Sequence, residues 1–291
     1  MGMSKVKIRL QGHEKFSLRE GWISKGLFAI SNESNAFLSK DATDIFGIGS
    51  NMVKSLRYWM KAFGLIEEKA GIGASLTSIG ELIYQYDPYI EDPFTLWIMH
   101  SNIVRNIDNA TTWSIFFNLC DVDSLEKEQV EKLLLREISK YAAGASFSEK
   151  SLSSDIDVLL NMYCKTKIKN DPEDKNVSPF ASLGLIKNAD GKITKTQPDK
   201  RILSEINILY ELSILLAKRK SISIEEAVNG DYGISKIYNL TNVSANDMLD
   251  RLDAEGTIRV DRTAGLDMIY PLLDLNTEEI LGKYYTSKSR G

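Results

Sequence analysis

The chain has 291 residues, of which 43% are hydrophobic and 26% charged, and its net charge is −4. This composition indicates a large core divided over two or more domains, and it excludes a protein that binds nucleic acid through bulk charge alone. No segment approaches the roughly 20 apolar residues of a membrane span, and the start MGMSKVKIRL lacks a signal-peptide core, so we expect a cytoplasmic protein.

Positive charge is concentrated in the N-terminal part. Residues 1–81 hold eleven Lys and Arg against eight Asp and Glu, which leaves 25 against 32 for the rest. These parts therefore carry +3 and −7, and a polyanion is expected to dock on the first of them. Cys120 and Cys164 lack the paired spacing of a zinc or redox site, which predicts two buried or free thiols.

Helical periodicity dominates the chain. The helices that it predicts cover residues 41–46, 51–63, 93–106, 109–119, 126–142, 149–163, 200–219, 233–240 and 244–255. Strands are predicted at 65–68 with 73–77 and at 257–261 with 267–271, each pair joined by a turn that contains glycine. The predicted fold class is mainly α, with multiple winged helix-turn-helix units that carry short β-hairpin wings.

A polar stretch broken by proline, KTKIKNDPEDKNVS at residues 165–178, marks the main domain boundary. We expect an N-terminal arm and a winged helix-turn-helix domain at 1–90, and a helical domain with a second helix-turn-helix at 91–164. A C-terminal helical domain with an acidic winged helix is expected at 165–291.

The first helix-turn-helix is DATDIFGIGSNMVKSLRYWMKAF, followed by a predicted hairpin. In such a unit the second helix enters the major groove, and flanking Lys and Arg hold phosphates. Lys54, Tyr58 and Lys61 recur at i, i+4 and i+7, opposite the apolar stripe. The predicted DNA contacts are Asn51, Lys54, Ser55, Arg57, Tyr58 and Lys61. The alternative is a packed helix with one solvated face.

The two later copies are more acidic. The second places Asp155 and Asp157 near its exposed side, which weakens a DNA assignment. The third exposes a run of acidic and amide side chains, namely Asn246, Asp247, Asp250, Asp253 and Glu255. Negative charge beside a phosphate backbone is repulsive, so this copy is expected to be structural or to bind protein.

The segment QGHEKFSLREGWISKG supplies the candidate catalytic residues His13, Glu14 and Arg19. A His beside a carboxylate can perform acid–base or metal chemistry, and an Arg can clamp a phosphate. The alternative is a buried polar network that pins the N-terminal arm to the winged domain.

The segment YQYDPYIEDPF supplies the candidate metal ligands Asp87, Glu91 and Asp92, with His100 nearby. Carboxylate oxygens suit Mg²⁺ or Mn²⁺. Asp92 before Pro93 is also a typical N-cap with proline at the first helical position, and this alternative explains two of these residues.

These segments carry a resemblance. The blocks GHEKFSLREGW, IGSNMVKSLRYWMKAFGLI, DPYIEDPFTLWIMH and NATTWSIFFN, with a looser block SEKSLSSDIDVLLNMY, resemble a bacterial family of unknown-function domain proteins encoded beside DNA phosphorothioation genes. The resemblance implies the nicking component of the single-stranded DNA phosphorothioation system, in which sulfur replaces a non-bridging phosphate oxygen. It further implies a cysteine desulfurase and an ATP-dependent sulfur-transfer protein as partners. It carries no catalytic residues over.

We therefore expect a DNA-binding component that nicks DNA by phosphodiester hydrolysis. Glu14 with Asp87, Glu91 or Asp92 would serve a metal-dependent reaction, and His13 with Arg19 would serve a metal-free one. The sequence lacks a familiar nuclease signature. The alternative is a non-enzymatic DNA-binding adaptor or a transcription regulator.

Overall fold

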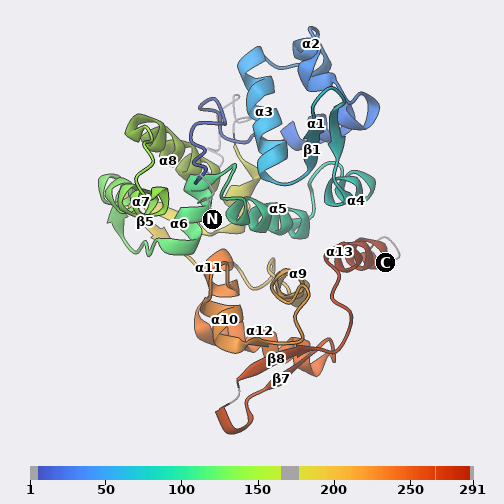
Figure 1. Cartoon of the computed structure of the whole chain (residues 1–291), viewed down its shortest axis with the longest axis vertical. Helices are drawn as coiled ribbons and strands as arrows, with labels where there is room; N and C mark the ends of the chain where they lie inside the picture. Colours follow the sequence, from blue (N-terminus) through green and yellow to red (C-terminus); the bar gives the residue numbers. More distant parts are fainter. Residues whose placement is uncertain (1–5, 165–176, 266, 289–291) are drawn as a thin grey trace, which may run out of the picture. The chain divides into compact units, whose positions relative to one another are not determined.

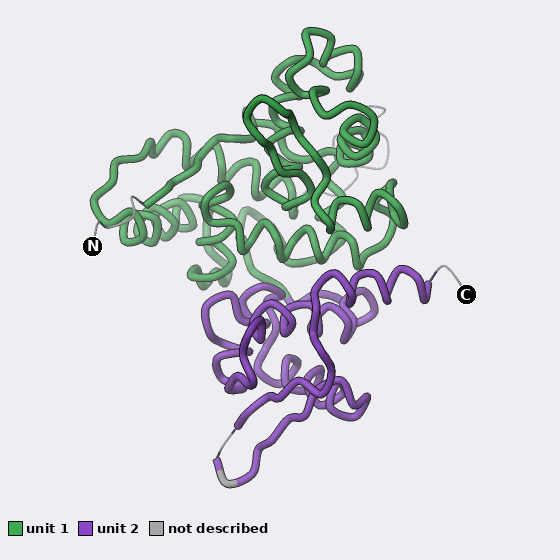
Figure 2. The backbone as a smooth tube through the Cα atoms, turned by 45° about the vertical axis from the view of Figure 1, so that its right-hand side comes forward, with its two compact units in different colours: residues 1–196 green, residues 197–291 purple. Residues whose placement is uncertain are grey.

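The computed structural model describes residues 6–164, 177–265 and 267–288. It divides into two compact units, Met1–Thr196 and Gln197–Gly291 (Figures 1 and 2). The division differs from the boundary predicted at 165–178, where residues 165–176 lie outside the described residues. In the described ranges no helix has the length and apolar character needed to cross a membrane.

Unit 1 begins with a group of elements built around one long amphipathic helix. They are α1 (Trp22–Asn32), η1 (Ala36–Leu38), α2 (Ala42–Phe46), α3 (Ser50–Ala62), β1 (Ile66–Lys69), β2 (Gly73–Leu76) and α4 (Ser78–Tyr86). The strands β1 and β2 form an antiparallel hairpin in which Ile66 faces Leu76. The predicted helices at 41–46 and 51–63 and the predicted hairpin are present.

Two helices of this group, α1 and α4, were not predicted from the sequence. In α1, Gly26 lies against α3 so closely that an added Cβ would be 2.7 Å from Met60 Sδ. This glycine therefore permits close packing of the two helices, although in a sequence it is read as a helix breaker. At the start of α4 the Thr77 hydroxyl accepts the Gly80 N–H at 3.1 Å, which is a normal N-cap.

The rest of unit 1 is a second group of helices with a small sheet. It comprises α5 (Pro93–Arg105), α6 (Thr111–Leu119), β3 (Leu125–Glu126), α7 (Lys127–Ala142), α8 (Glu149–Cys164), η3 (Pro179–Leu183), β4 (Ile186–Ala189) and β5 (Lys192–Lys195). The sheet has the order β3-β5-β4. Its hairpin turns at Asp190 and Gly191, both of which have positive φ, as expected for an Asp-Gly turn.

An aromatic core joins the two groups of unit 1. Trp59 of α3 packs edge to face on Trp113 of α6, with ring centroids 5.4 Å apart. Phe63 stacks on Phe180 of η3 at 5.3 Å, and Tyr163 of α8 meets the same ring at 5.6 Å. All five side chains are almost fully buried, so the C-terminal end of α3 is anchored to the core.

Unit 2 also combines helices with a small three-stranded sheet. It contains α9 (Glu205–Leu215), β6 (Ile222–Ser223), α10 (Ile224–Asn229), α11 (Ile234–Tyr238), α12 (Asn242–Ala254), β7 (Ile258–Asp261), η4 (Thr263–Gly265), β8 (Met268–Pro271) and α13 (Thr277–Lys288). Its sheet has the order β6-β8-β7, which matches β3-β5-β4 strand for strand. The prediction of a mainly α fold is confirmed.

Some acidic side chains of α12 form an ion pair or a hydrogen bond within unit 2. Asp250 pairs with Arg262 at 2.6 Å, and Asp253 accepts the Val260 N–H at 3.0 Å. These contacts tie the helix to its hairpin. Asp250 and Asp253 nevertheless remain exposed, so this face of α12 is acidic, as the sequence predicts.

Candidate nucleic-acid interface

The N-terminal arm, residues 6–20, lies against the side of α3 that was expected to face solvent. Gly12 approaches Tyr58 so closely that an added Cβ would be 2.5 Å from the ring atom Cδ2. The Ser55 hydroxyl donates a hydrogen bond of 3.4 Å to the backbone carbonyl of Phe16. The arm therefore covers the middle of α3.

A buried network centred on Asp155 fixes the arm to α8 and α6. His13 Nε2 lies 2.8 Å from Asp155 Oδ1, and the backbone N–H of Gln11 donates to the same oxygen at 2.7 Å. The Thr112 hydroxyl donates to Asp155 Oδ2 at 2.7 Å. The Lys15 N–H donates to His13 Nδ1 at 3.1 Å, so the ring proton is placed on Nε2.

This network corrects the placement of Asp155 near the exposed side of its helix, because the residue is only 1% exposed. His13 is 0% exposed and stacks on Trp59, with ring centroids 5.8 Å apart. Both ring nitrogens of His13 have partners. The geometry therefore favours a structural role, in which the polar network fixes the arm, rather than acid–base chemistry on a bound substrate. This network attaches the arm to the second group of helices.

A cleft of about 440 Å³ lies between the arm, α3 and the loop before α6. Apart from Gly12 and the ring of Tyr58, its lining residues are charged or carry an amide, and the full set is Lys7, Arg9, Gly12, Glu14, Lys54, Arg57, Tyr58, Lys61 and Asn109. Among these described residues five are cationic and one, Glu14, is a carboxylate. The cleft is therefore a strongly basic hollow on an acidic chain.

The cations of the cleft fall into two sets. Within the described parts of the chain, Lys7, Arg9 and Lys54 form no ion pair. The backbone of Arg9 is fixed by its N–H, which donates to Thr111 Oγ1 at 2.9 Å. Lys54 Nζ donates only weakly, to Asn51 Oδ1 at 3.3 Å. These three charges are available to an anion.

The other two cations share one acidic partner, Glu68 of β1. Arg57 donates to both carboxylate oxygens, with the Nη2–Oε2 bond at 3.0 Å, and Lys61 Nζ donates to Oε2 at 2.7 Å. The hydrogen bonds from Arg57, and then those from Lys61, hold the pKa of Glu68 below its ordinary value. The carboxylate is thus charged at neutral pH and partly neutralises this end of the cleft.

The predicted DNA contacts on α3 separate into exposed and covered residues. Asn51 and Lys54 are exposed, and Arg57 and Lys61 are partly exposed at the cleft. The other two, Ser55 and Tyr58, are buried. This burial corrects their expected exposure, and its cause is the arm, which packs over them.

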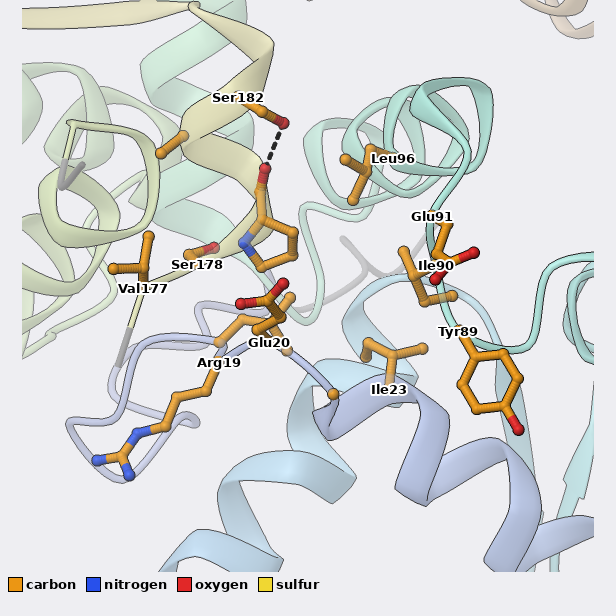
Figure 3. Close-up of a pocket in the computed structure, with 14 residues that line it drawn as sticks. Arg19, Glu20, Ile23, Tyr89, Ile90, Glu91, Leu96, Val177, Ser178 and Ser182 are labelled. Carbon is orange, nitrogen blue, oxygen red and sulfur yellow. Dashed lines mark hydrogen bonds between the residues drawn. The ribbon is translucent and has the colours of Figure 1, made fainter. Parts of the chain in front are cut away.

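The predicted catalytic residues do not come together. His13 is buried, Glu14 lines the cleft, and Arg19 lines a separate cavity of about 550 Å³ (Figure 3). The Arg19 guanidinium lies 5.4 Å from the centre of the Trp22 ring, and burial lowers its pKa. Figure 3 shows this guanidinium turned away from Glu91, which lines the other side of the cavity. Arg19 is therefore placed for stacking.

The predicted metal ligands Asp87 and Asp92 serve the local backbone. Asp87 accepts hydrogen bonds from Glu91 N at 2.9 Å, from Asp92 N at 3.1 Å and from the Thr95 hydroxyl at 2.6 Å. Asp92 caps α5 by accepting the Phe94 N–H at 3.0 Å, as its alternative role predicts. Among the described residues no group of three or more metal-binding side chains is gathered. This set does not fit a Mg²⁺ or Mn²⁺ ion.

The described fold is a mainly helical one with small antiparallel sheets and a basic cleft under an N-terminal arm. Residues 10–285 match the family described as Protein of unknown function (DUF4007), so the chain belongs to this family. No curated protein matches the sequence.

Two solved structures of SspB have a similar fold. A magnesium ion-bound crystal structure of SspB is 22% identical, with a TM-score of 0.84 over 96% of this chain and 88% of that chain. A second SspB crystal structure is 21% identical, with a TM-score of 0.80 over 97% of this chain and 95% of that chain. At this level of identity the likeness establishes a shared fold.

Sequence reasoning missed the arm's contribution to the cleft. Lys7 and Arg9 alternate with apolar residues in KVKIRL, a period of two that is typical of an extended segment with one basic face. The described residues follow this pattern, since Lys7 and Arg9 are exposed while Ile8 and Leu10 are partly buried. The alternation was the available signal. No comparable signal marks Asp155 or Glu68, whose partners are distant or lie on another element.

Proposed function

We propose that this protein is a DNA-binding component of a DNA phosphorothioation system and that it grips the phosphate backbone in the cleft between the arm and α3. The single observation that carries the proposal is the charge of the cleft, five cations against one lining carboxylate, on a chain with a net charge of −4. A chain of acidic composition attracts a polyanion only where its cations are gathered in this way.

The arm determines how DNA would be held. In a winged helix the second helix of the helix-turn-helix lies in the major groove, and the order α2, α3, β1, β2 is the order of such a unit. Here Ser55 and Tyr58, in the middle of α3, are covered by the arm. The exposed cations that remain, Lys7, Arg9 and Lys54, suit phosphate contacts. The proposed interface therefore holds the backbone and reads few bases.

Membership of a phosphorothioation system is supported by the fold shared with SspB, a component of such a system, and by the DUF4007 family. The proposed partners are a cysteine desulfurase and an ATP-dependent sulfur-transfer protein. In a cell that carries the whole system, deletion of this gene should remove phosphorothioate-linked dinucleotides from digested genomic DNA, as read by mass spectrometry. Unchanged levels would contradict the assignment.

Lysine footprinting tests the DNA-binding site directly. The protein is acetylated with and without a short DNA duplex, and the modified lysines are quantified by mass spectrometry. Lys7 and Lys54 should be protected by DNA, because both line the cleft. Lys132 and Lys187 are exposed and lie outside the cleft, so their modification should not change. If bound DNA left the modification of Lys7 and Lys54 unchanged, as at Lys132 and Lys187, the interface would lie elsewhere.

A second candidate function is strand nicking, and one observation favours it. Glu14 is the carboxylate that lines the basic cleft, where it would lie beside a held phosphodiester and could accept a proton from an attacking water. Supercoiled plasmid should then convert to open circle, in assays with and without Mg²⁺ or Mn²⁺. Glu14→Ala should abolish conversion and retain binding. Binding without conversion by the wild-type protein would leave a non-enzymatic adaptor or a regulator.

A further inference from the structure

Glu68 pairs with two cations that line the cleft, Arg57 and Lys61, in the manner of a bound anion. It reaches these two cations from β1, where its neighbour Glu67 instead pairs with Lys69 at 3.2 Å. Arg57 holds both oxygens of the Glu68 carboxylate, and Lys61 adds a third donor at 2.7 Å. A guanidinium fork of this kind recognises a carboxylate and a phosphate with the same geometry.

The ion pairs of Glu68 with Arg57 and Lys61 are partly exposed to solvent, so another anion can replace the carboxylate. The side chains of Arg57 and Lys61 are 37% and 39% exposed, while that of Glu68 is 19% exposed. Ion pairs at such positions contribute little net stability, because water and salt screen them. A DNA phosphate that reaches the cleft can therefore take the place of the carboxylate at small cost.

We propose that Arg57 and Lys61 form an exchangeable anion subsite of the cleft, which Glu68 occupies in the free chain and a DNA phosphate occupies in the complex. The proposal rests on the proposed function, since it assumes that DNA enters this cleft. Its consequence is that Glu68 weakens binding and sets how many cations take part. The three unpaired cations make the first contacts, and the subsite adds its contacts when the carboxylate is displaced.

The test compares Glu68→Gln with Glu67→Gln. Each variant removes one negative charge from neighbouring positions of β1, but only the first frees Arg57 and Lys61. Affinity for a labelled duplex and for a labelled single strand of mixed sequence is measured by fluorescence anisotropy over a range of salt. Glu68→Gln should bind about three- to tenfold more tightly than the wild-type protein. Its salt slope should steepen by about one to two units, whereas Glu67→Gln should match the wild-type protein.

Identical affinity and salt slope for Glu68→Gln and Glu67→Gln would overturn the inference. If Lys54→Ala still weakens binding in that case, the cleft remains the DNA site and only the exchange is refuted. If Glu68→Gln and Lys54→Ala both leave DNA binding unchanged, the proposed function fails as well. A second measurement uses the folded wild-type protein, whose Arg57 side-chain N–H signal should shift in NMR spectra when DNA is added. An Arg57 signal unmoved by saturating DNA would also refute the exchange.

Discussion

His13 Nε2 lies 2.8 Å from Asp155 Oδ1, and both side chains are buried, although 142 residues separate them in the sequence. This contact joins the N-terminal arm to α8. The cleft depends on it, because the arm that it holds supplies Lys7 and Arg9. The buried network is thus the structural support of the basic site.

Loss of the Asp155 carboxylate should destabilise the fold. Asp155→Ala removes the acceptor for Gln11 N, His13 Nε2 and Thr112 Oγ1, and buried donors without acceptors are costly. We expect the free energy of unfolding, measured with urea, to fall by about 2 to 4 kcal/mol. Asp157→Ala, which removes an exposed pair with Lys127, should cost less than about 1 kcal/mol. Equal effects of the two changes would contradict the role of the network.

A methyl group at Gly12 should displace the arm. The Cβ added by Gly12→Ala would lie 2.5 Å from the Tyr58 ring, which is too close for a non-bonded contact, so the arm or the ring must move. Limited proteolysis should then cut the arm faster, and DNA affinity should fall with it. Gly282→Ala is the matched control, because its Cβ would meet nothing within 4 Å. If the arm of Gly12→Ala were cut no faster than the arm of the wild-type protein, the arm would not pack on α3 as described.

The Cys120 thiol should be unreactive in the folded chain. Burial raises its pKa from 9.0 to about 12, so its thiolate fraction near neutral pH should be about a thousandfold lower than in the unfolded chain. Alkylation by iodoacetamide, followed by mass spectrometry, should therefore be slow until urea is added. Rapid alkylation of Cys120 without urea would contradict this placement.

The same raised pKa has a consequence for stability at high pH. The folded chain binds the thiol proton more tightly than the unfolded chain does, so the stability contributed by this group is complete below pH 9 and is lost as the pH rises toward 12. The free energy of unfolding should fall over this window more steeply in the wild-type protein than in Cys120→Ala. Parallel curves would contradict the shift.

The sequence was sufficient for elements with a strong local pattern. The apolar stripe through Leu56 and Trp59 predicted α3, and Asp92 before Pro93 predicted the start of α5. The free thiols at Cys120 and Cys164 were also expected from their spacing. In each case the residues that decide the structure are neighbours on one element.

The rest depends on contacts between distant segments. The spacing of Tyr58 placed it opposite the apolar stripe, and a single helix offers no sign that an arm will cover that side. No helix was predicted at α1, where Gly26 packs against Met60 of another helix. Asp155 looked exposed for the same reason, since its partners belong to the arm and to α6.

The salt dependence of DNA binding tests the central claim most directly. Kd for a mixed-sequence duplex is measured from about 50 to about 200 mM salt for the wild-type protein and for Arg9→Ala/Lys54→Ala. A second double variant, Lys132→Ala/Lys187→Ala, removes two exposed lysines outside the cleft. The cleft variant should bind more weakly, with a slope of log K against log salt reduced by about 0.9 per lost phosphate contact. The control should match the wild-type protein. Equal slopes and affinities for all three proteins would contradict a phosphate-binding cleft.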